Sequence, residues 1–149
     1  SFSKYHRIAF RANLGQSTGN FEEERQYFLG GAGGMRGYTK PVFIGENIAI
    51  FSLEYRFPLL TELDLNLSGL ALLHLIQGAI FTDLGTVSNE RNTFELRNFK
   101  SDFGAGIRLY FDMFGVQPTI FRIDAAYPIS SPIESEKDVH YYLSVGQSF

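Results

Sequence analysis

The chain has 149 residues, no cysteine and a net charge of −3, and its length suits one domain. This charge gives no general attraction to nucleic acid, and the lack of cysteine excludes disulfides and thiolate metal sites. The three histidines, His6, His74 and His140, are scattered, so we expect no bound metal and no other cofactor. The aromatic residues are all Phe or Tyr, and their abundance is typical of a β-rich protein.

Six segments alternate apolar and polar residues with a period of two, which is the pattern of β-strands. They are residues 6–14, 48–57, 74–86, 102–111, 119–127 and 140–149. In segment 48–57, for example, Ser52, Glu54 and Arg56 share one face, whereas Leu53 and Tyr55 share the other. Every Arg, Asp and Glu of the six segments falls on one such face. We therefore predict six antiparallel strands of about nine to eleven residues, each with a charged and an apolar face.

Two all-β architectures explain this segregation. In a transmembrane β-barrel the apolar face meets lipid, where an Arg or Lys near the midplane would cost roughly 2–4 kcal/mol. In a soluble β-sandwich the apolar face would point inward. Small residues and mixed charges on the polar face favour the barrel, as do aromatic residues near the strand ends. These aromatic residues are Tyr5, Tyr55, Phe57, Phe111, Phe114, Tyr127, Tyr141 and Phe149.

The connections between the segments differ in length. We expect residues 15–47, 87–101 and 128–139 to form external loops and residues 112–118 to form a tight periplasmic turn. Residues 58–73 are longer than this rule favours, and the alternating run at residues 63–67 is compatible with a short helix or a strand extension. Because a closed membrane barrel needs about eight strands, six strands predict the carboxyl-terminal portion of a larger barrel, or a sheet that pairs with another chain.

A glycine-rich segment, residues 30–38, contains a single cation, Arg36. Taken alone, it is typical of a mobile surface loop with a solvated arginine. A phosphate-binding loop is excluded because no Gly-Lys-Ser/Thr follows it. Three other motifs in the sequence, taken together with this segment, indicate a more specific role for it.

Four motifs resemble, in order, those of the BamA-type outer-membrane superfamily, the bacterial surface antigen domain. Residues 34–38 resemble its Val-Arg-Gly-Phe/Tyr loop motif, with Met35 in place of valine. Residues 52–58 resemble its glutamate-bearing strand, and residues 81–87 its Phe-x-Asp-x-Gly strand. Residues 144–149 resemble its terminal strand signal. The residues of the loop and strand motifs are Gly34, Met35, Arg36, Gly37, Tyr38, Glu54, Phe81, Asp83 and Gly85.

The resemblance covers essentially the whole chain. It implies that residues 1–149 form the last six of about sixteen strands of an outer-membrane β-barrel, in the outer membrane of a bacterium or an organelle. It further implies that residues 15–47 fold into the lumen, where Arg36 meets Glu54 and Asp83. The strand phases independently place both carboxylates on the polar face. Two carboxylates also suggest a glycosidase pair, but no substrate cleft is identifiable, so we expect no catalytic residue and no enzyme activity.

The resemblance gives the last strand two roles, as the signal for membrane insertion and as one side of a seam that opens sideways. The residues concerned are Tyr141, Leu143, Val145, Gly146 and Phe149. The leading hypothesis is a barrel segment of an insertase or translocase for outer-membrane or secreted proteins. Its expected partners are outer-membrane lipid, the upstream part of the barrel or a partner chain, a client protein and accessory lipoproteins. The alternatives are a barrel anchor or secretion pore for a fused or partner enzyme, and a soluble β-sandwich or lipocalin-like binding protein.

Overall fold

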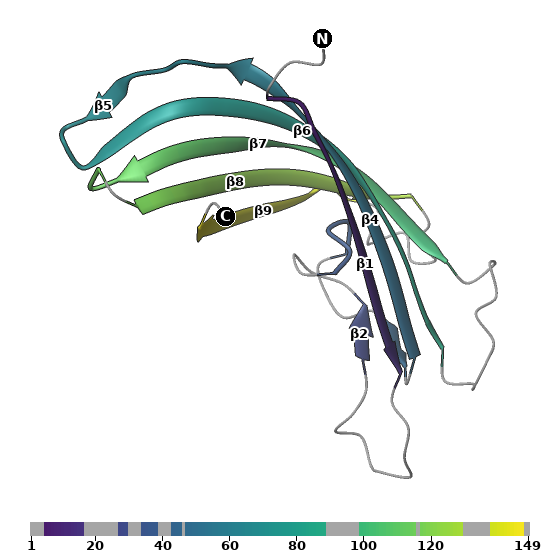
Figure 1. Ribbon diagram of the computed structural model, residues 1–149. Coiled ribbons are helices and arrows are strands. Elements are labelled where there is room, and N and C mark those ends of the chain that lie inside the picture. Colours follow the sequence, from purple (N-terminus) through teal and green to yellow (C-terminus); the bar gives the residue numbers. More distant parts are fainter. Residues whose placement is uncertain are drawn as a thin grey trace.

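The described chain forms one large antiparallel sheet. This computed structural model describes residues 5–16, 27–29, 34–38, 43–45, 47–88, 99–115, 117–129 and 138–147. The sheet has seven strands in the order β1-β4-β6-β7-β8-β9, with β5 attached to β6, and β2 and β3 pair separately (Figure 1). The strands are β1 (Arg7–Gln16), β2 (Tyr27–Leu29), β3 (Phe43–Gly45), β4 (Asn47–Leu60), β5 (Leu65–Leu67), β6 (Ala71–Ser88), β7 (Lys100–Met113), β8 (Gln117–Pro128) and β9 (His140–Gln147).

All six segments predicted from the alternation are strands, and all neighbours pair antiparallel. The predicted length of nine to eleven residues was wrong for the central strands, because β6 has 18 residues and β4 and β7 have 14 each. An apolar band sets only the length that a bilayer core requires. Neighbouring strands continue to exchange backbone hydrogen bonds beyond that band, so the ladder extends further.

The undecided segment at residues 63–67 contains a strand and no helix. Leu65 pairs with Leu73 and Leu67 with Ala71, so β5 forms a hairpin with the start of β6. Positive φ angles at Ser68 and Gly69 allow the tight turn between them. The predicted turn at residues 112–118 is also present, between Met113 and Gln117. The backbone N–H of Phe114 donates to the carbonyl of Leu70 at 2.8 Å and joins the two turns.

The sheet buries many of its charged side chains and exposes its apolar face, which is the opposite of a soluble sandwich. Several charged residues on one face are almost completely buried, with Asp83 and Asp102 at 0% exposure and Arg108 at 1%. Apolar residues on the other face are open, with Ile8 at 72% and Leu143 at 73%. The predicted phase of the strands is therefore confirmed. The soluble sandwich would require the reverse, with the apolar face covered by a second sheet.

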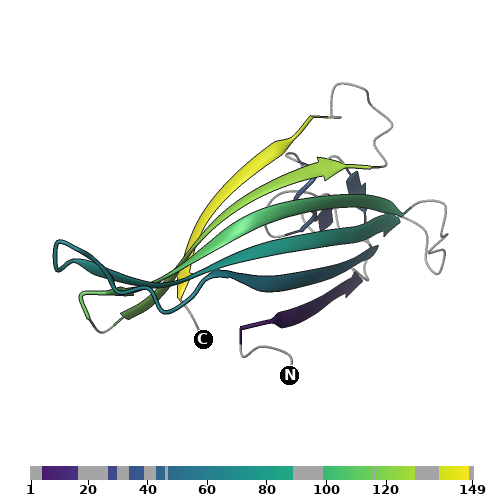
Figure 2. The same ribbon diagram turned by 90° about the horizontal axis from the view of Figure 1, so that it is seen from above.

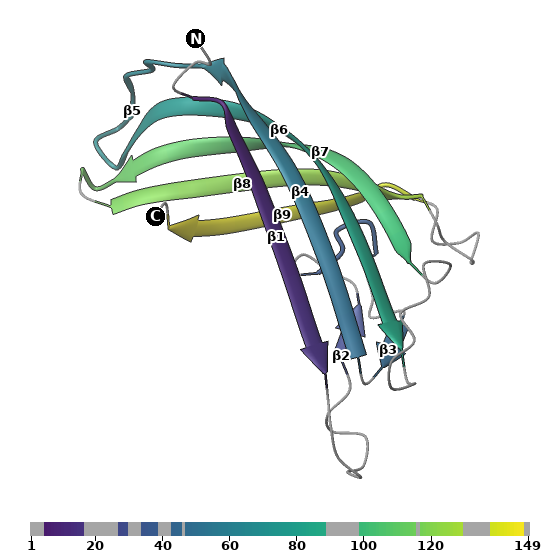
Figure 3. The same ribbon diagram turned by 45° about the vertical axis from the view of Figure 1, so that its right-hand side comes forward.

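The sheet bends into an open trough with β2 and residues 34–38 on its concave side (Figures 1 and 3). Register shifts at Pro58/Leu60 and at Leu73/Leu75 accompany the bend, as expected of β-bulges. Strands β1 and β9 lie at opposite edges of the sheet (Figure 2). Among the described strands, β1 pairs only with β4 and β9 only with β8. No helix in the described part of the chain is long and apolar enough to cross a membrane.

Candidate functional site: an arginine loop on the concave face

A short loop, residues 34–38, sits on the concave face and is held there by two apolar anchors. Met35 and Tyr38 are 0% and 1% exposed, and they pack with Ile48 and Ile50 of β4. The N–H of Tyr38 donates to the carbonyl of Met35 at 3.3 Å, which closes a turn. Burial of two large side chains on either side of Arg36 fixes where the guanidinium can reach.

Arg36 joins two strands through their carboxylates. Its Nε and Nη2 donate to the two oxygens of Asp83 on β6, at 3.0 and 3.1 Å. Its Nη1 donates to Oε2 of Glu54 on β4 at 2.8 Å, and its backbone N–H also reaches Asp83 at 3.3 Å. Only a planar guanidinium supplies donors in this forked arrangement. The structure thus brings together the three charged residues that the resemblance associates.

Phe81, the aromatic residue of the strand motif, packs against the guanidinium of Arg36. The Cζ atom of Arg36 lies 3.3 Å from the centroid of the Phe81 ring, a cation–π contact. The ring occupies space above Gly104, its cross-strand partner, where a Cβ would overlap both the ring and the carbonyl of Ala125. Gly85, the last residue of the motif, is buried further along β6. No contact to Phe81 was predicted beyond its place in the motif.

Gly37 explains why a glycine follows the arginine. Its N–H donates to Oδ2 of Asp102 on β7 at 2.7 Å, and a Cβ at this position would overlap the Asp102 side chain. Asp102 is the cross-strand partner of Asp83. Two completely buried carboxylates therefore stand side by side, and like charges directly opposite each other repel. The loop places donors of Arg36 and Gly37 on this pair.

A second arginine extends the network to the next strands. Arg108 on β7 donates to both oxygens of Asp124 on β8 and, at 3.2 Å, to Oε2 of Glu54. Arg56 donates to the other oxygen of Glu54 at 2.7 Å. The strand phase predicts that Arg108 and Asp124 lie on the charged face, but the link of Arg108 to Glu54 was not predicted. The strand phase combined with the antiparallel register could have revealed it.

Arg36 stays protonated in this environment. Burial alone would lower the pKa of its guanidinium, but hydrogen bonds and the charges of Asp83 and Glu54 raise that pKa above its ordinary value. The side chain therefore remains a cation at any physiological pH. The described residues contain no cluster of three metal-binding side chains. The chemistry available here is electrostatic attachment of the loop to β4, β6 and β7 through Glu54, Asp83 and Asp102, and to β8 through Asp124, 3.7 Å from Nη1 of Arg36.

The last strand contacts the loop through a residue that was not predicted. The Tyr142 hydroxyl of β9 donates to the carbonyl of Tyr38 at 3.3 Å. The predicted seam residues Tyr141, Leu143 and Val145 instead point to the exposed apolar face. Gly146 has open space where a Cβ would lie. Phe149 lies outside the described residues, as do residues 30–33 of the glycine-rich segment.

A sheet with an exposed apolar face and a charged concave face, filled by a docked loop, defines a β-barrel-type outer-membrane domain. The chain belongs to the Omp85 superfamily, because the family model described as the Omp85 superfamily domain matches residues 2–149. Proteins of this superfamily are outer-membrane proteins, and the family is associated in general with protein insertion and translocation. Searches of curated proteins and of solved structures each gave no match.

Proposed function

We propose that this domain is the carboxyl-terminal part of a BamA-type barrel of about sixteen strands that assembles or exports outer-membrane or secreted proteins. The observation that carries the proposal is the docking of Arg36 on Glu54 and Asp83. A transporter that handles unfolded chains needs a stable wall beside a seam that can rearrange. The network stabilises the wall of β4, β6, β7 and β8 without any bond chemistry.

The two sheet edges give this wall its partners. Strands β1 and β9 each have one pairing strand within the described sheet, and unpaired edges bind further strands readily. We propose that β1 continues into the remainder of the barrel, supplied by the same polypeptide or by a partner chain. At β9, a client strand adds by β-augmentation. The exposed apolar face meets outer-membrane lipid, and accessory lipoproteins bind elsewhere on the assembled protein.

The first experiment tests the loop as a brace. Arg36→Ala is introduced into the protein, which is purified in detergent and reconstituted in liposomes. Removing one partner of a buried pair costs about 3–5 kcal/mol, so we expect loss of heat-modifiable mobility at lower temperature and slower insertion of an unfolded β-barrel client. Arg36→Lys keeps the charge without the fork and should give an intermediate effect.

Arg7→Ala is the matched control, because Arg7 is an exposed arginine on β1 and its loss should change neither readout. Equal heat-modifiability and equal client insertion by Arg36→Ala and the unmodified protein would refute the brace.

The second experiment tests the edge. Because the chain has no cysteine, a single cysteine at Ser144 of β9 can report crosslinks to a client that carries one cysteine in its own last strand. We expect crosslinks from Ser144 and none from Asn13 of β1. Absence of crosslinks at β9 during active insertion would exclude β-augmentation at this edge.

A further inference from the structure

The exposed apolar face is not uniform, because a groove crosses it over β4, β6, β7 and β8. Ala105 of β7 pairs with Ala125 of β8, and the two methyl groups leave a low point in the face. On either side in the same register stand larger residues, Ile80 on β6 and Tyr141 on β9. The hollow has a volume of about 910 Å³ and is largely open to the outside.

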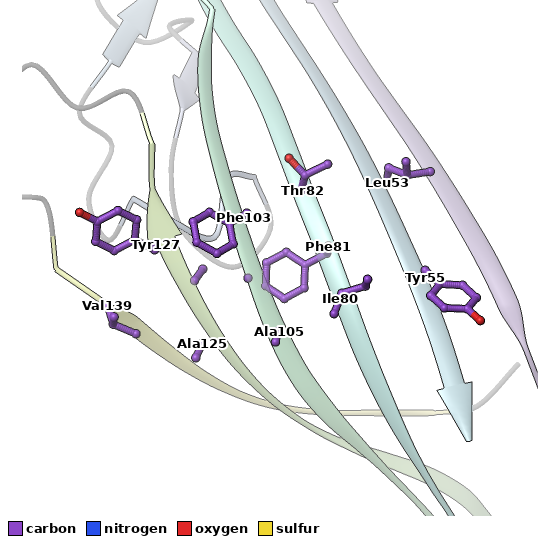
Figure 4. A pocket seen from close by; sticks show the side chains of 12 residues that line it. Leu53, Tyr55, Ile80, Phe81, Thr82, Phe103, Ala105, Ala125, Tyr127 and Val139 are labelled. Atoms are coloured by element: carbon purple, nitrogen blue, oxygen red, sulfur yellow. The ribbon is translucent and has the colours of Figure 1, made fainter. Parts of the chain in front are cut away.

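The walls of the groove are rings and branched side chains. Phe103 and Tyr127, a cross-strand pair with ring centroids 6.0 Å apart, form one end. Leu53 and Tyr55 of β4 line the opposite side, and Val139 lies beside Tyr127 (Figure 4). No lining residue carries a charge. The surface offered to an occupant is therefore almost entirely hydrocarbon.

The polar atoms among the lining residues are largely engaged within the protein. The Thr82 hydroxyl donates to the carbonyl of Asp102 at 2.8 Å. The Tyr55 hydroxyl is hydrogen-bonded to Nδ1 of His6 at 2.7 Å. An occupant would thus find methyl groups and ring faces without competing hydrogen-bonding groups. Such a surface suits an alkyl chain and gives no advantage to a polar ligand.

The floor of the groove is fixed from the opposite face. Gly104 lies in the floor, and the Phe81 ring packs against it from the concave side. Phe81 is in turn covered by the guanidinium of Arg36. The network that attaches the loop therefore also contacts this part of the sheet from its concave side.

We propose that this groove binds one acyl chain of an outer-membrane lipid. The groove is continuous with the apolar face, on which Ile8, Phe10 and Leu143 are each more than two-thirds exposed. The inference rests on the proposed contact of this face with lipid, but not on client insertion. Tyr127 lies one residue before the end of β8, so its hydroxyl is placed to meet the lipid headgroup region while the chain runs toward Ala105.

The test compares lipid retention by the intact protein and by a variant with a filled groove. Ala105→Leu/Ala125→Leu replaces the low point with branched side chains, and native mass spectrometry after a delipidating detergent wash counts phospholipid still bound. We expect retention to fall by at least about fivefold. Ala12→Leu, which adds one such side chain to the exposed face of β1 outside the groove, should retain lipid as the unmodified protein does.

A second measurement identifies the occupant even if the filled variant fails to fold. Phe103 is replaced by p-azidophenylalanine, which has a similar shape, and the adduct formed on illumination in membranes is analysed by mass. A phospholipid adduct supports the proposal, whereas a polypeptide adduct or equal lipid retention by the filled variant overturns it. Client insertion is measured in parallel, so that loss of the proposed transport function is not confused with loss of the lipid site.

Discussion

The two faces of the sheet differ in how their side chains are stabilised, although the same strands form both. On the concave face, Arg36 and Arg108 share Glu54 and lie against buried carboxylates through directional hydrogen bonds. On the convex face, residues such as Ile80 and Leu143 are exposed. The side chains of the concave face find their partners within the protein, whereas those of the convex face are left open to its surroundings.

This difference shows where stability and tolerance reside. Each buried charge on the concave face depends on a particular partner, because an unpaired charge in a dry environment is costly. The convex face depends only on remaining apolar, so one hydrophobic residue can replace another. The most destabilising substitutions should therefore be those that remove a charge partner on the concave face or add a charge to the convex face.

The largest effect is expected from Arg108→Met. Arg108 is 1% exposed, and its loss removes both hydrogen bonds to Asp124 and one to Glu54. We expect the free energy of unfolding in detergent to fall by about 3–5 kcal/mol, measured by urea titration.

Its cross-strand neighbour Arg122 is the matched control, because it makes no ion pair with any described residue. Arg122→Met should change stability by no more than about 0.5 kcal/mol. Similar losses for the two variants would mean that burial of the pair does not set the stability of this face.

A charge on the convex face should have the next largest effect. Ile107 on β7 points outward and is 42% exposed, so Ile107→Arg places a guanidinium against lipid. The expected cost is about 2–4 kcal/mol near the bilayer midplane, seen as reduced folding into liposomes. Ile107→Met keeps the face apolar and should fold normally. Normal folding of the arginine variant would show that this face does not meet hydrocarbon.

Gly37→Ala tests the close approach of the loop to β7. The added methyl group would overlap Asp102, and the loop must shift or lose its hydrogen bond to that carboxylate. Overpacking of this kind costs about 1–3 kcal/mol, measurable as a lower midpoint of heat-modifiability. Gly146→Ala, where a Cβ meets open space, serves as the control and should leave the midpoint unchanged.

The sequence contains most of the information for the strands because alternation is a local property. Six strand segments and their charged face follow from the period of two, and Glu54 and Asp83 indeed lie on that face. The position of the loop is different. Nothing in the local pattern of residues 34–38 directs Arg36 inward, and only the resemblance to a family suggested its two partners.

The parts that the sequence did not reveal depend on contacts between distant strands. Asp102 meets Gly37 only because β7 pairs with β6 in a register that places Asp102 opposite Asp83. The β5 hairpin extends the sheet where the apolar pattern was compatible with a helix. Tyr142 reaches the loop from β9 across the concave face. Such contacts require the register and the bend of the sheet together.

The smallest effect is expected from Tyr142→Phe, which removes the hydroxyl that joins β9 to the loop at the Tyr38 carbonyl. A single hydrogen bond of this kind contributes about 0.5–1.5 kcal/mol, so global stability should change little. Amide hydrogen exchange should reveal the local consequence, because β9 has a pairing strand on one side only among the described strands. We expect faster exchange along β9 and unchanged exchange in β4 and β6.

Since the proposed seam lies at β9, a tether that restrains this strand would also slow its pairing with a client. Tyr142→Phe should then speed client crosslinking at Ser144, and equal exchange and crosslinking rates would show that the loop does not restrain the edge.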